Sequence, residues 1–274
     1  MTPQESPARG ERRLMAVLAH PDDESLGIGG LLAAYAASGV ETYLVTATRG
    51  ERGRFFTNDP RPSDAEVGRV RGAELWAAAQ VLGVREVALL DYVDGELDHA
   101  DSQEAVGRIV AQLRRVRPQV VVTFDPFGAY GHPDHVAICQ LTTAAVLAAA
   151  DPAFANDAEP HRVSKLYYFV TDERRWAVYQ SAFKRLTSRV DGEERCGVAW
   201  PSWAVSATID ARDHWRTVWQ AVKCHSTQLA VYGRLEELTS DEHEALWGSV
   251  ALYRAFSRVN GGRTRETDLF AGLS

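Results

Sequence analysis

The sequence predicts an α/β fold: a Rossmann-like, mostly parallel sheet with helices on both faces, followed by an irregular C-terminal α/β extension. Two observations carry this prediction. Short apolar runs alternate with helical segments over residues 14–150, and 45% of the 274 residues are hydrophobic, which is enough for one large core. Strands that follow one another through helices form right-handed βαβ units and therefore a parallel sheet.

The first half of the chain holds the strand and helix pairs of this core. The expected strands are the runs 14–19, 40–47, 86–90 and 119–124, and the expected helices that follow them are 25–38, 67–82, 103–116 and 134–150. The loops 49–65 and 91–102 are rich in Gly, Asp and Arg and exceed the usual connection of about 2–6 residues. Because ligands bind at the carboxyl ends of parallel strands, this extra length predicts a pocket there.

The second half is less regular. After a polar junction at 151–162, we expect strands at 165–170, 204–209 and 249–257 and helices at 174–187, 211–223 and 239–247. Residues 14–274 are therefore expected to form one domain, made of a core (14–150) and a C-terminal part (151–274). Residues 1–13 are polar, contain two prolines and are expected to form a flexible N-terminus.

Composition narrows the classes of function. A net charge of −7 argues against a nucleic-acid-binding surface, which needs concentrated Lys and Arg. No segment approaches the roughly 20 apolar residues that span a bilayer, and the N-terminus lacks the apolar region of a secretory signal. The three cysteines are far apart and form no CxxC pair. These features predict a reduced, cytoplasmic protein; the oligomeric state, including a homo-oligomer, is left open.

Two clusters of histidine and carboxylate side chains follow expected strands. The run 19–24, with the sequence AHPDDE, comes directly after the first strand, and the run 132–135, HPDH, comes shortly after the fourth. Both lie at carboxyl ends of strands, which meet at one edge of a parallel sheet. We expect the two clusters to form a single site.

The spacing of these residues predicts a catalytic metal centre. Such a centre needs about three protein ligands and one open position for water. His20 and Asp23 lie in one tight turn, and His135 from the other cluster completes a His-Asp-His set. Zinc, Fe²⁺ or another divalent ion suits imidazole and carboxylate ligands.

The remaining members of the clusters are assigned to proton transfer and support. Asp22 would stay off the metal and act as general base on water. His132 would donate a proton to the leaving group or stabilise oxyanion charge, and Asp134 would orient an imidazole.

Three other interpretations compete with this one. Asp22 or Asp23 alone is explained as the cap of a helix that begins near Ser25. Two histidines and a carboxylate also form the Fe(II) triad of oxygenases, although those usually sit on all-β scaffolds. The glycines within residues 27–30 follow the first strand but do not form the GxGxxG motif. The evidence for a dinucleotide-binding site is therefore weak.

The strings AHPDDE and YGHPDH, in this order and after strands, resemble the LmbE/PIG-L family of metal-dependent N-acetylglucosaminyl de-N-acetylases. Further similar segments are VRGAELWAAAQVLGV, TRGERG, DYVDGEL, KCHSTQL and DLFAGL, so the resemblance covers nearly the whole chain. It implies hydrolysis of the acetamide of an N-acetylated amino sugar, with zinc held by His20, Asp23 and His135. A thiol-conjugate amidase of the same family is the alternative.

The resemblance also implies roles for residues outside the two clusters. Tyr130 matches a tyrosine that hydrogen-bonds the acetamide oxygen in some members. The segments around Tyr130 and at 142–146 are most similar to members that act on a glucosaminyl-inositol, as in mycothiol biosynthesis. In those enzymes, residues at the positions of Glu51, Arg71 and Asp94 hold the sugar hydroxyls.

Overall fold

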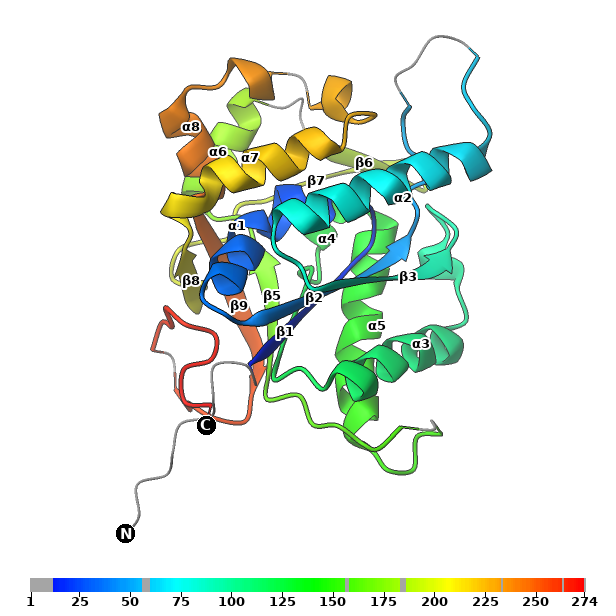
Figure 1. Ribbon diagram of the computed structural model, residues 1–274, viewed down its shortest axis with the longest axis vertical. Coiled ribbons are helices and arrows are strands. Elements are labelled where there is room, and N and C mark those ends of the chain that lie inside the picture. The colour runs from blue at the N-terminus through cyan, green and yellow to red at the C-terminus, as the bar shows by residue number, and fades with distance from the viewer. Residues whose placement is uncertain are drawn as a thin grey trace.

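A seven-stranded sheet runs through the part of the chain that the structure describes (Figure 1). The computed structural model describes residues 12–55, 60–155, 158–182, 186–232, 234–262 and 264–273. The strand order is β3-β2-β1-β4-β5-β9-β8. The strands are β1 (Arg13–Leu18), β2 (Glu41–Thr48), β3 (Glu86–Tyr92), β4 (Val120–Thr123), β5 (Lys165–Val170), β8 (Ala207–Asp210) and β9 (Ser249–Ser257).

The sheet is mostly parallel, which confirms the predicted fold class. All pairings from β3 through β2, β1 and β4 to β5 are parallel, whereas β9 is antiparallel to β5 and β8 is antiparallel to β9. The chain leaves β1 in one direction, towards β2 and β3, and returns to β4 on the other side of β1. The carboxyl ends of β1 and β4 therefore flank the switch point, where ligands bind in such sheets.

Helices cover both faces of the sheet, as predicted (Figure 1). One layer contains α1 (Asp23–Ala37), α2 (Asp64–Val81) and α7 (Trp215–Cys224), and the other contains α3 (Ser102–Val116) and α5 (Pro133–Ala150). The handedness of the crossovers explains this division, because connections that move in opposite directions along the sheet place their helices on opposite faces. The side chains of β1 and β4 between these layers are almost fully buried.

The region after β5 differs from the prediction. The expected helix 174–187 is shorter: α6 spans Glu173–Ala182, and a hairpin of β6 (Thr187–Val190) and β7 (Glu193–Cys196) follows. Asp191 and Gly192 form its turn with φ of 52° and 84°, which is the left-handed geometry that an Asp-Gly hairpin turn requires. Residues 183–185 of the expected helix lie outside the described residues.

The remaining elements are short. They are α4 (Gly128–Gly131), α8 (Ser240–Trp247) and the 3₁₀ turns Leu97–His99, Arg212–His214, Leu229–Val231 and Leu235–Glu237. Arg13 already belongs to β1, and residues 1–11 of the expected flexible N-terminus lie outside the described residues. Among the described residues, no helix combines the length and apolarity that crossing a membrane requires.

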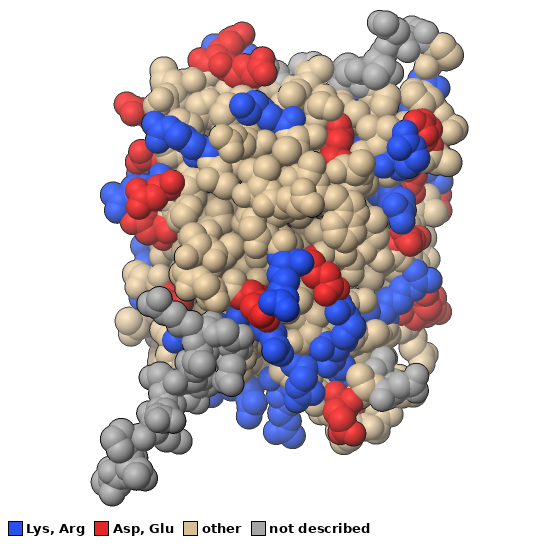
Figure 2. All heavy atoms as spheres, in the orientation of Figure 1, with Lys and Arg blue, Asp and Glu red and all other residues tan. Residues whose placement is uncertain are grey.

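Charged side chains of both signs lie side by side at the amino ends of the strands (Figure 2). Arg13 and Arg85 both pair with Glu41 at the start of β2, and Arg115 pairs with Glu86 at the start of β3. Exposed pairs of this kind contribute about 1 kcal/mol or less each. This edge is opposite to the one that carries the two His/Asp clusters.

Candidate active site

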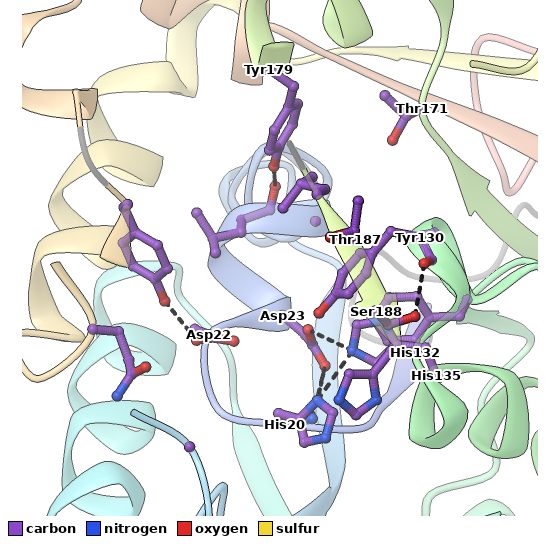
Figure 3. A pocket seen from close by; sticks show the side chains of 18 of the residues that line it. His20, Asp22, Asp23, Tyr130, His132, His135, Thr171, Tyr179, Thr187 and Ser188 are labelled. Atoms are coloured by element: carbon purple, nitrogen blue, oxygen red, sulfur yellow. Dashed lines mark hydrogen bonds and ion pairs between the residues drawn. The ribbon is translucent and has the colours of Figure 1, made fainter. Parts of the chain in front are cut away.

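The structure brings the two His/Asp clusters together at the carboxyl ends of β1 and β4 (Figure 3). His20 comes from the turn between β1 and α1, and His135 comes from the first turn of α5. Their ring nitrogens face each other, with His20 Nδ1 3.1 Å from His135 Nε2. Both side chains are buried.

Asp23 completes a triangle with these two rings. Its carboxylate lies 3.6 Å from His20 Nδ1 and 3.5 Å from His135 Nε2, and it also accepts the backbone N–H of His20 at 2.8 Å. Ligand atoms that share a tetrahedral zinc at about 2.0–2.2 Å lie about 3.3–3.5 Å from one another. The three side chains therefore fit the donor set of a divalent metal ion.

Hydrogen bonds on the outer sides of both rings support this fit. His20 Nε2 lies 3.0 Å from Asp134 Oδ2 and 3.2 Å from Asp94 Oδ1, and His135 Nδ1 lies 3.3 Å from the carbonyl oxygen of Gly128. A neutral ring that donates its outer N–H to these acceptors keeps a lone pair on its inner nitrogen, which is how metal-binding histidines are usually held.

Asp134 is itself fixed by the backbone. It is fully buried, and its carboxylate accepts the N–H groups of Gly95 at 2.7 Å and of Leu97 at 3.1 Å. Asp134 thus connects the loop after β3 to His20. The structure therefore places Asp134 in contact with the ring that it is expected to orient.

The pKa values of the three side chains are strongly perturbed. Burial opposes the charged form of His20, but hydrogen bonds to Asp134, Asp23 and Asp94 outweigh burial and raise its pKa well above 6.5, so a metal ion would bind by displacing the proton from the inner nitrogen. Burial lowers the pKa of His135 to about 3. Burial would raise the pKa of Asp23, but His135 and His20 together hold it far below 3.8. Asp23 is therefore a carboxylate at neutral pH, as a metal ligand must be.

Two further groups of potential ligands share His20. Nitrogen atoms of His20, His132 and His135 lie within 4.8 Å of one another, and so do ligand atoms of His20, Asp94 and Asp134. The second group involves the outer nitrogen of His20. Hydrogen bonds from this nitrogen already explain why the carboxylates of Asp94 and Asp134 lie close to it. In the first group, His132 takes the place of Asp23 as the third potential metal ligand.

Asp22 occupies a different environment from its neighbour Asp23. It stands at the N-cap position of α1, yet its side chain makes no capping hydrogen bond. Instead, its Oδ2 accepts from Tyr232 Oη at 2.6 Å and from Arg71 Nη2 at 3.1 Å. Burial raises the pKa of Asp22, and the nearby Arg71 guanidinium offsets part of that rise. The helix-cap interpretation of Asp22 is therefore wrong.

His132 packs against the rings of both His20 and His135. Its ring centroid is 4.8 Å from that of His20 and 4.8 Å from that of His135. The N–H of Asp134 donates to His132 Nδ1 at 3.2 Å, so the neutral ring carries its proton on Nε2. Burial, followed by the charge of His20, lowers the pKa of His132. His132 is thus a neutral N–H donor at pH 7.

Tyr130 precedes this histidine in a loop of unusual backbone geometry. Gly128, Ala129 and Gly131 have φ of 59°, 60° and 81°, and the Asp125 carboxylate accepts the N–H of Ala129 at 3.0 Å. The Tyr130 ring packs edge-on against His135, with 5.3 Å between the centroids. The loop places a phenol beside the proposed metal ligands.

The three residues assigned to sugar binding lie in different places. Arg71 and Asp94 line the cavity described below, whereas Glu51 does not. Arg71 donates to the carbonyl oxygens of Gly50 at 2.7 Å and Pro21 at 2.6 Å in addition to Asp22. Glu51 Oε1 accepts the N–H of Asp94 at 2.9 Å. Glu51 thus supports the loop that carries Asp94.

A cavity of about 780 Å³ opens beside these side chains (Figure 3). It is large enough for a disaccharide-sized ligand. Its walls come from the β1–α1 turn, the loop after β4, α6, the β6–β7 hairpin and the segment after α7. Residues that line it outside the two His/Asp clusters include Thr171, Trp176, Tyr179, Thr187, Ser188 and Gln228.

Sequence reasoning did not find Tyr232 and left Glu24 and His225 without roles. Glu24 and His225 are fully buried, and His225 Nε2 lies 2.7 Å from Glu24 Oε1. The pair joins residues 201 positions apart, which no local pattern signals. Tyr232 lies in an irregular segment of 3₁₀ turns, where periodicity says nothing about which side chains face a cavity.

Fold and site together define an α/β enzyme whose chemistry takes place at the carboxyl edge of a parallel sheet. The family model for PIG-L, described as GlcNAc-PI de-N-acetylase, matches residues 15–146. A 1D-myo-inositol 2-acetamido-2-deoxy-alpha-D-glucopyranoside deacetylase from Streptomyces avermitilis is 35% identical over 96% of this chain and 98% of its own length. The chain therefore belongs to the PIG-L family and is a hydrolytic N-deacetylase.

Solved structures agree with the fold. The conserved protein TT1542 from Thermus thermophilus is similar with a TM-score of 0.64 and 26% identity, over 92% of this chain and 98% of that one. GalB, a 4-carboxy-2-hydroxymuconate hydratase from Pseudomonas putida, has a TM-score of 0.66 at 20% identity, over 92% and 99% of the two chains. Because a hydratase shares this fold, the reaction has to be argued from the site.

Proposed function

We propose that this deacetylase removes the N-acetyl group from a small molecule that contains N-acetylglucosamine, with a glucosaminyl-inositol as the preferred substrate class. One observation carries the proposal: His20, Asp23 and His135 converge beside a cavity into which a separate carboxylate, Asp22, projects. The similarity to the Streptomyces avermitilis deacetylase, whose name specifies an inositol-linked sugar, supports this substrate class.

The donor set suits zinc. Two imidazole nitrogens and one carboxylate match the type and number of protein ligands in catalytic zinc sites, which keep a further position for water. When bound, zinc supplies a Lewis acid that polarises the amide carbonyl and makes a water molecule more acidic. His20, Asp23 and His135 would hold the ion, and Asp134 and Asp94 would fix the orientation of the His20 ring.

Asp22 is the proposed general base. It lines the cavity next to Asp23, and its raised pKa brings it closer to the range in which a carboxylate accepts a proton efficiently at neutral pH. In the proposed reaction, Asp22 takes a proton from the attacking water and later passes it to the departing amine.

His132 and Tyr130 are the proposed partners of the amide oxygen. His132 offers an N–H from Nε2 and Tyr130 offers a phenol O–H, and both side chains line the cavity beside the ligand rings. Burial raises the pKa of Tyr130, which keeps its hydroxyl protonated and able to donate. Two such donors stabilise the negative charge that develops on the oxygen.

Sugar recognition is assigned by similarity to Arg71, Asp94 and Glu51. Arg71 and Asp94 line the cavity within reach of a bound sugar, and the Asp94 carboxylate is held ionised because His20 outweighs the effect of burial and lowers its pKa to about 2. Glu51 would act through the Asp94 loop rather than by direct contact.

A substrate panel tests the proposal. Acetate release would be measured with N-acetylglucosaminyl-inositol, N-acetylglucosaminyl-malate and chitin fragments, and cysteine-conjugate cleavage would be measured with a thiol-conjugate amide. The expected result is the highest kcat/KM for the inositol glycoside. A higher kcat/KM for the thiol conjugate would replace the proposed substrate with that of the amidase alternative.

A further inference from the structure

The backbone of Asp22 has a strained geometry that contacts with neighbouring residues must stabilise. Its φ is 103° and its ψ is −25°, in the left-handed region that non-glycine residues rarely adopt. Such strained residues persist only where the surrounding structure fixes them, and they cluster at functional sites. The contacts of Asp22 show which residues do so.

Glu24 and His225 hold the backbone. The Asp22 N–H donates to Glu24 Oε2 at 3.0 Å, while Glu24 Oε1 meets His225 Nε2 at 2.7 Å and accepts from Ser25 Oγ at 2.5 Å. Glu24 and His225 are both 0% exposed. A buried carboxylate keeps one conformation only when its oxygens are satisfied, so the His225 ring, just past the end of α7, fixes the carboxylate that binds the Asp22 backbone.

Tyr232 and Arg71 hold the side chain. Both donate to the same oxygen, Oδ2, at 2.6 Å and 3.1 Å respectively. Within the described part of the chain, no hydrogen bond is made to Oδ1. One oxygen of the carboxylate is therefore anchored, and the side chain lines the cavity.

His225 and Tyr232 belong to one segment, and that segment is anchored independently of the site. Glu74 in α2 accepts from Ser226 Oγ at 2.7 Å, from the Thr227 N–H at 2.8 Å and from Thr227 Oγ1 at 2.7 Å. Segment 225–232 is thus attached to the helix layer and reaches the β1–α1 turn at two points, one on the backbone and one on the carboxylate of Asp22.

We propose that His225 and Tyr232 are positioning residues that hold Asp22 with Oδ1 facing the reacting water. This inference rests on the proposed function, because it assumes that Asp22 is the base. It assigns Oδ2 to anchoring and Oδ1 to proton transfer. It also gives segment 225–232, which is far from the His/Asp clusters in sequence, a part in the site.

Tyr232→Phe tests the anchoring of the side chain, because it removes one hydroxyl and keeps the ring. We expect kcat to fall about tenfold, the loss typical of one hydrogen bond to a charged group, while KM changes less than about twofold. Bound metal per chain should stay at the wild-type value, and the variant should remain folded. Tyr43→Phe is the matched control: Tyr43 Oη also donates to a carboxylate, Glu41, at 3.0 Å, but at the far edge of the sheet. This control should retain wild-type kcat.

A double-mutant cycle separates positioning from any general effect. In an Asp22→Asn background, Tyr232→Phe should lower the residual kcat by less than about twofold, because the carboxylate that Tyr232 positions is already gone. The same tenfold loss in both backgrounds would overturn the role of Tyr232. An Asp22→Asn enzyme with wild-type kcat would instead overturn the proposed base, whatever Tyr232→Phe does.

His225 is tested by a pair of variants. His225→Ala removes the group that meets Glu24, and His225→Gln retains an N–H donor at a similar reach. We expect the alanine variant to lose kcat at unchanged metal content and the glutamine variant to recover most of that loss. Equal loss in both folded variants would overturn the role of His225. If His225→Ala does not fold, wild-type kcat in Glu24→Gln, which removes the charge that His225 faces, would overturn it.

Discussion

At the scale of single residues, Asp22 and Asp23 are neighbours in the chain with opposite environments. Asp23 faces His20 and His135, which lower its pKa, whereas burial raises the pKa of Asp22. The separation depends on the left-handed backbone of Asp22, which turns the two carboxylates in different directions. In the proposed mechanism, Asp23 binds the metal ion and Asp22 accepts the proton.

This division predicts different outcomes for the two alanine variants. Asp22→Ala should keep its metal and lose turnover by about 10²–10⁴, the range for a general acid or base. Asp23→Ala should lose the metal, since it removes one of three ligands. Metal content by mass spectrometry and acetate release are the measurements. Loss of metal from Asp22→Ala would reverse the two assignments.

His132 offers a second test at this scale. His132→Ala should slow acetate release by about 10²–10³, the cost of removing one donor to the developing oxyanion, without emptying the metal site. Because His132 also lies within ligand distance of His20 and His135, metal content decides between the two possible ligand sets. An empty site in His132→Ala, together with a filled site in Asp23→Ala, would make His132 the third ligand.

The sequence predicts the members of this site that lie in its two short motifs. His20, Asp23, His135 and Asp134 converge because each follows a strand end that the alternating pattern already places. Tyr232 could not be predicted in the same way. Its contact with Asp22 spans 210 positions and depends on how 3₁₀ turns pack, which apolar periodicity does not describe.

At the scale of elements, α1 determines where the first motif lies, and its close packing depends on glycine. A Cβ on Gly30 would lie 2.5 Å from the carbonyl oxygen of Trp247 and 2.9 Å from Ala211 Cβ. Backbone atoms on the other side cannot move away cheaply. Gly30 therefore allows α1 to approach α8 and the end of β8.

Gly30→Ala should lower the free energy of unfolding by about 1–3 kcal/mol, the usual cost of overpacking. Gly107→Ala in α3 is the control, because a Cβ there would meet nothing within 4 Å. The control should instead gain about 0.5–1 kcal/mol, since alanine favours a helix interior. Urea denaturation of both variants measures the difference. Equal stabilities of the two variants would contradict the packing argument.

Elements were predictable where the hydrophobic period was clear and much less so beyond β5. The parallel strands are buried on both sides and appear in the sequence as continuous apolar runs. The β6–β7 hairpin has mostly exposed or half-buried side chains, so it lacks such a run. Its Asp-Gly turn was the one local signal that pointed to a hairpin.

At the scale of the whole molecule, a buried charge network attaches the last described segment to the sheet. Lys165 in β5 is 0% exposed, and its Nζ donates to Glu266 Oε1 at 2.8 Å. Tyr167 Oη donates to Glu266 Oε2 at 2.5 Å, and Arg254 Nη1 lies 3.0 Å from Glu266 Oε1. Glu266 therefore pairs with cationic side chains from two strands, Lys165 in β5 and Arg254 in β9.

Glu266→Gln should lower the free energy of unfolding by about 3 kcal/mol at pH 7, because it leaves Lys165 buried without a countercharge. Burial would raise the pKa of Glu266, but hydrogen bonds from Lys165 and Tyr167 outweigh burial and lower it below 4.5. Its ionised form thus stabilises the fold above about pH 4.5, and this contribution is lost as pH falls through the lowered value. The Tm difference from wild type should shrink on acidification; a constant difference would contradict this.

The central claim is that the converged His20, Asp23 and His135 hold a metal ion on which deacetylation depends. The most direct measurement is acetate release from N-acetylglucosaminyl-inositol by enzyme stripped with a chelator and then titrated with zinc. We expect negligible release from the stripped enzyme and recovery at about one zinc per chain. Undiminished release from enzyme shown to be free of metal would contradict it.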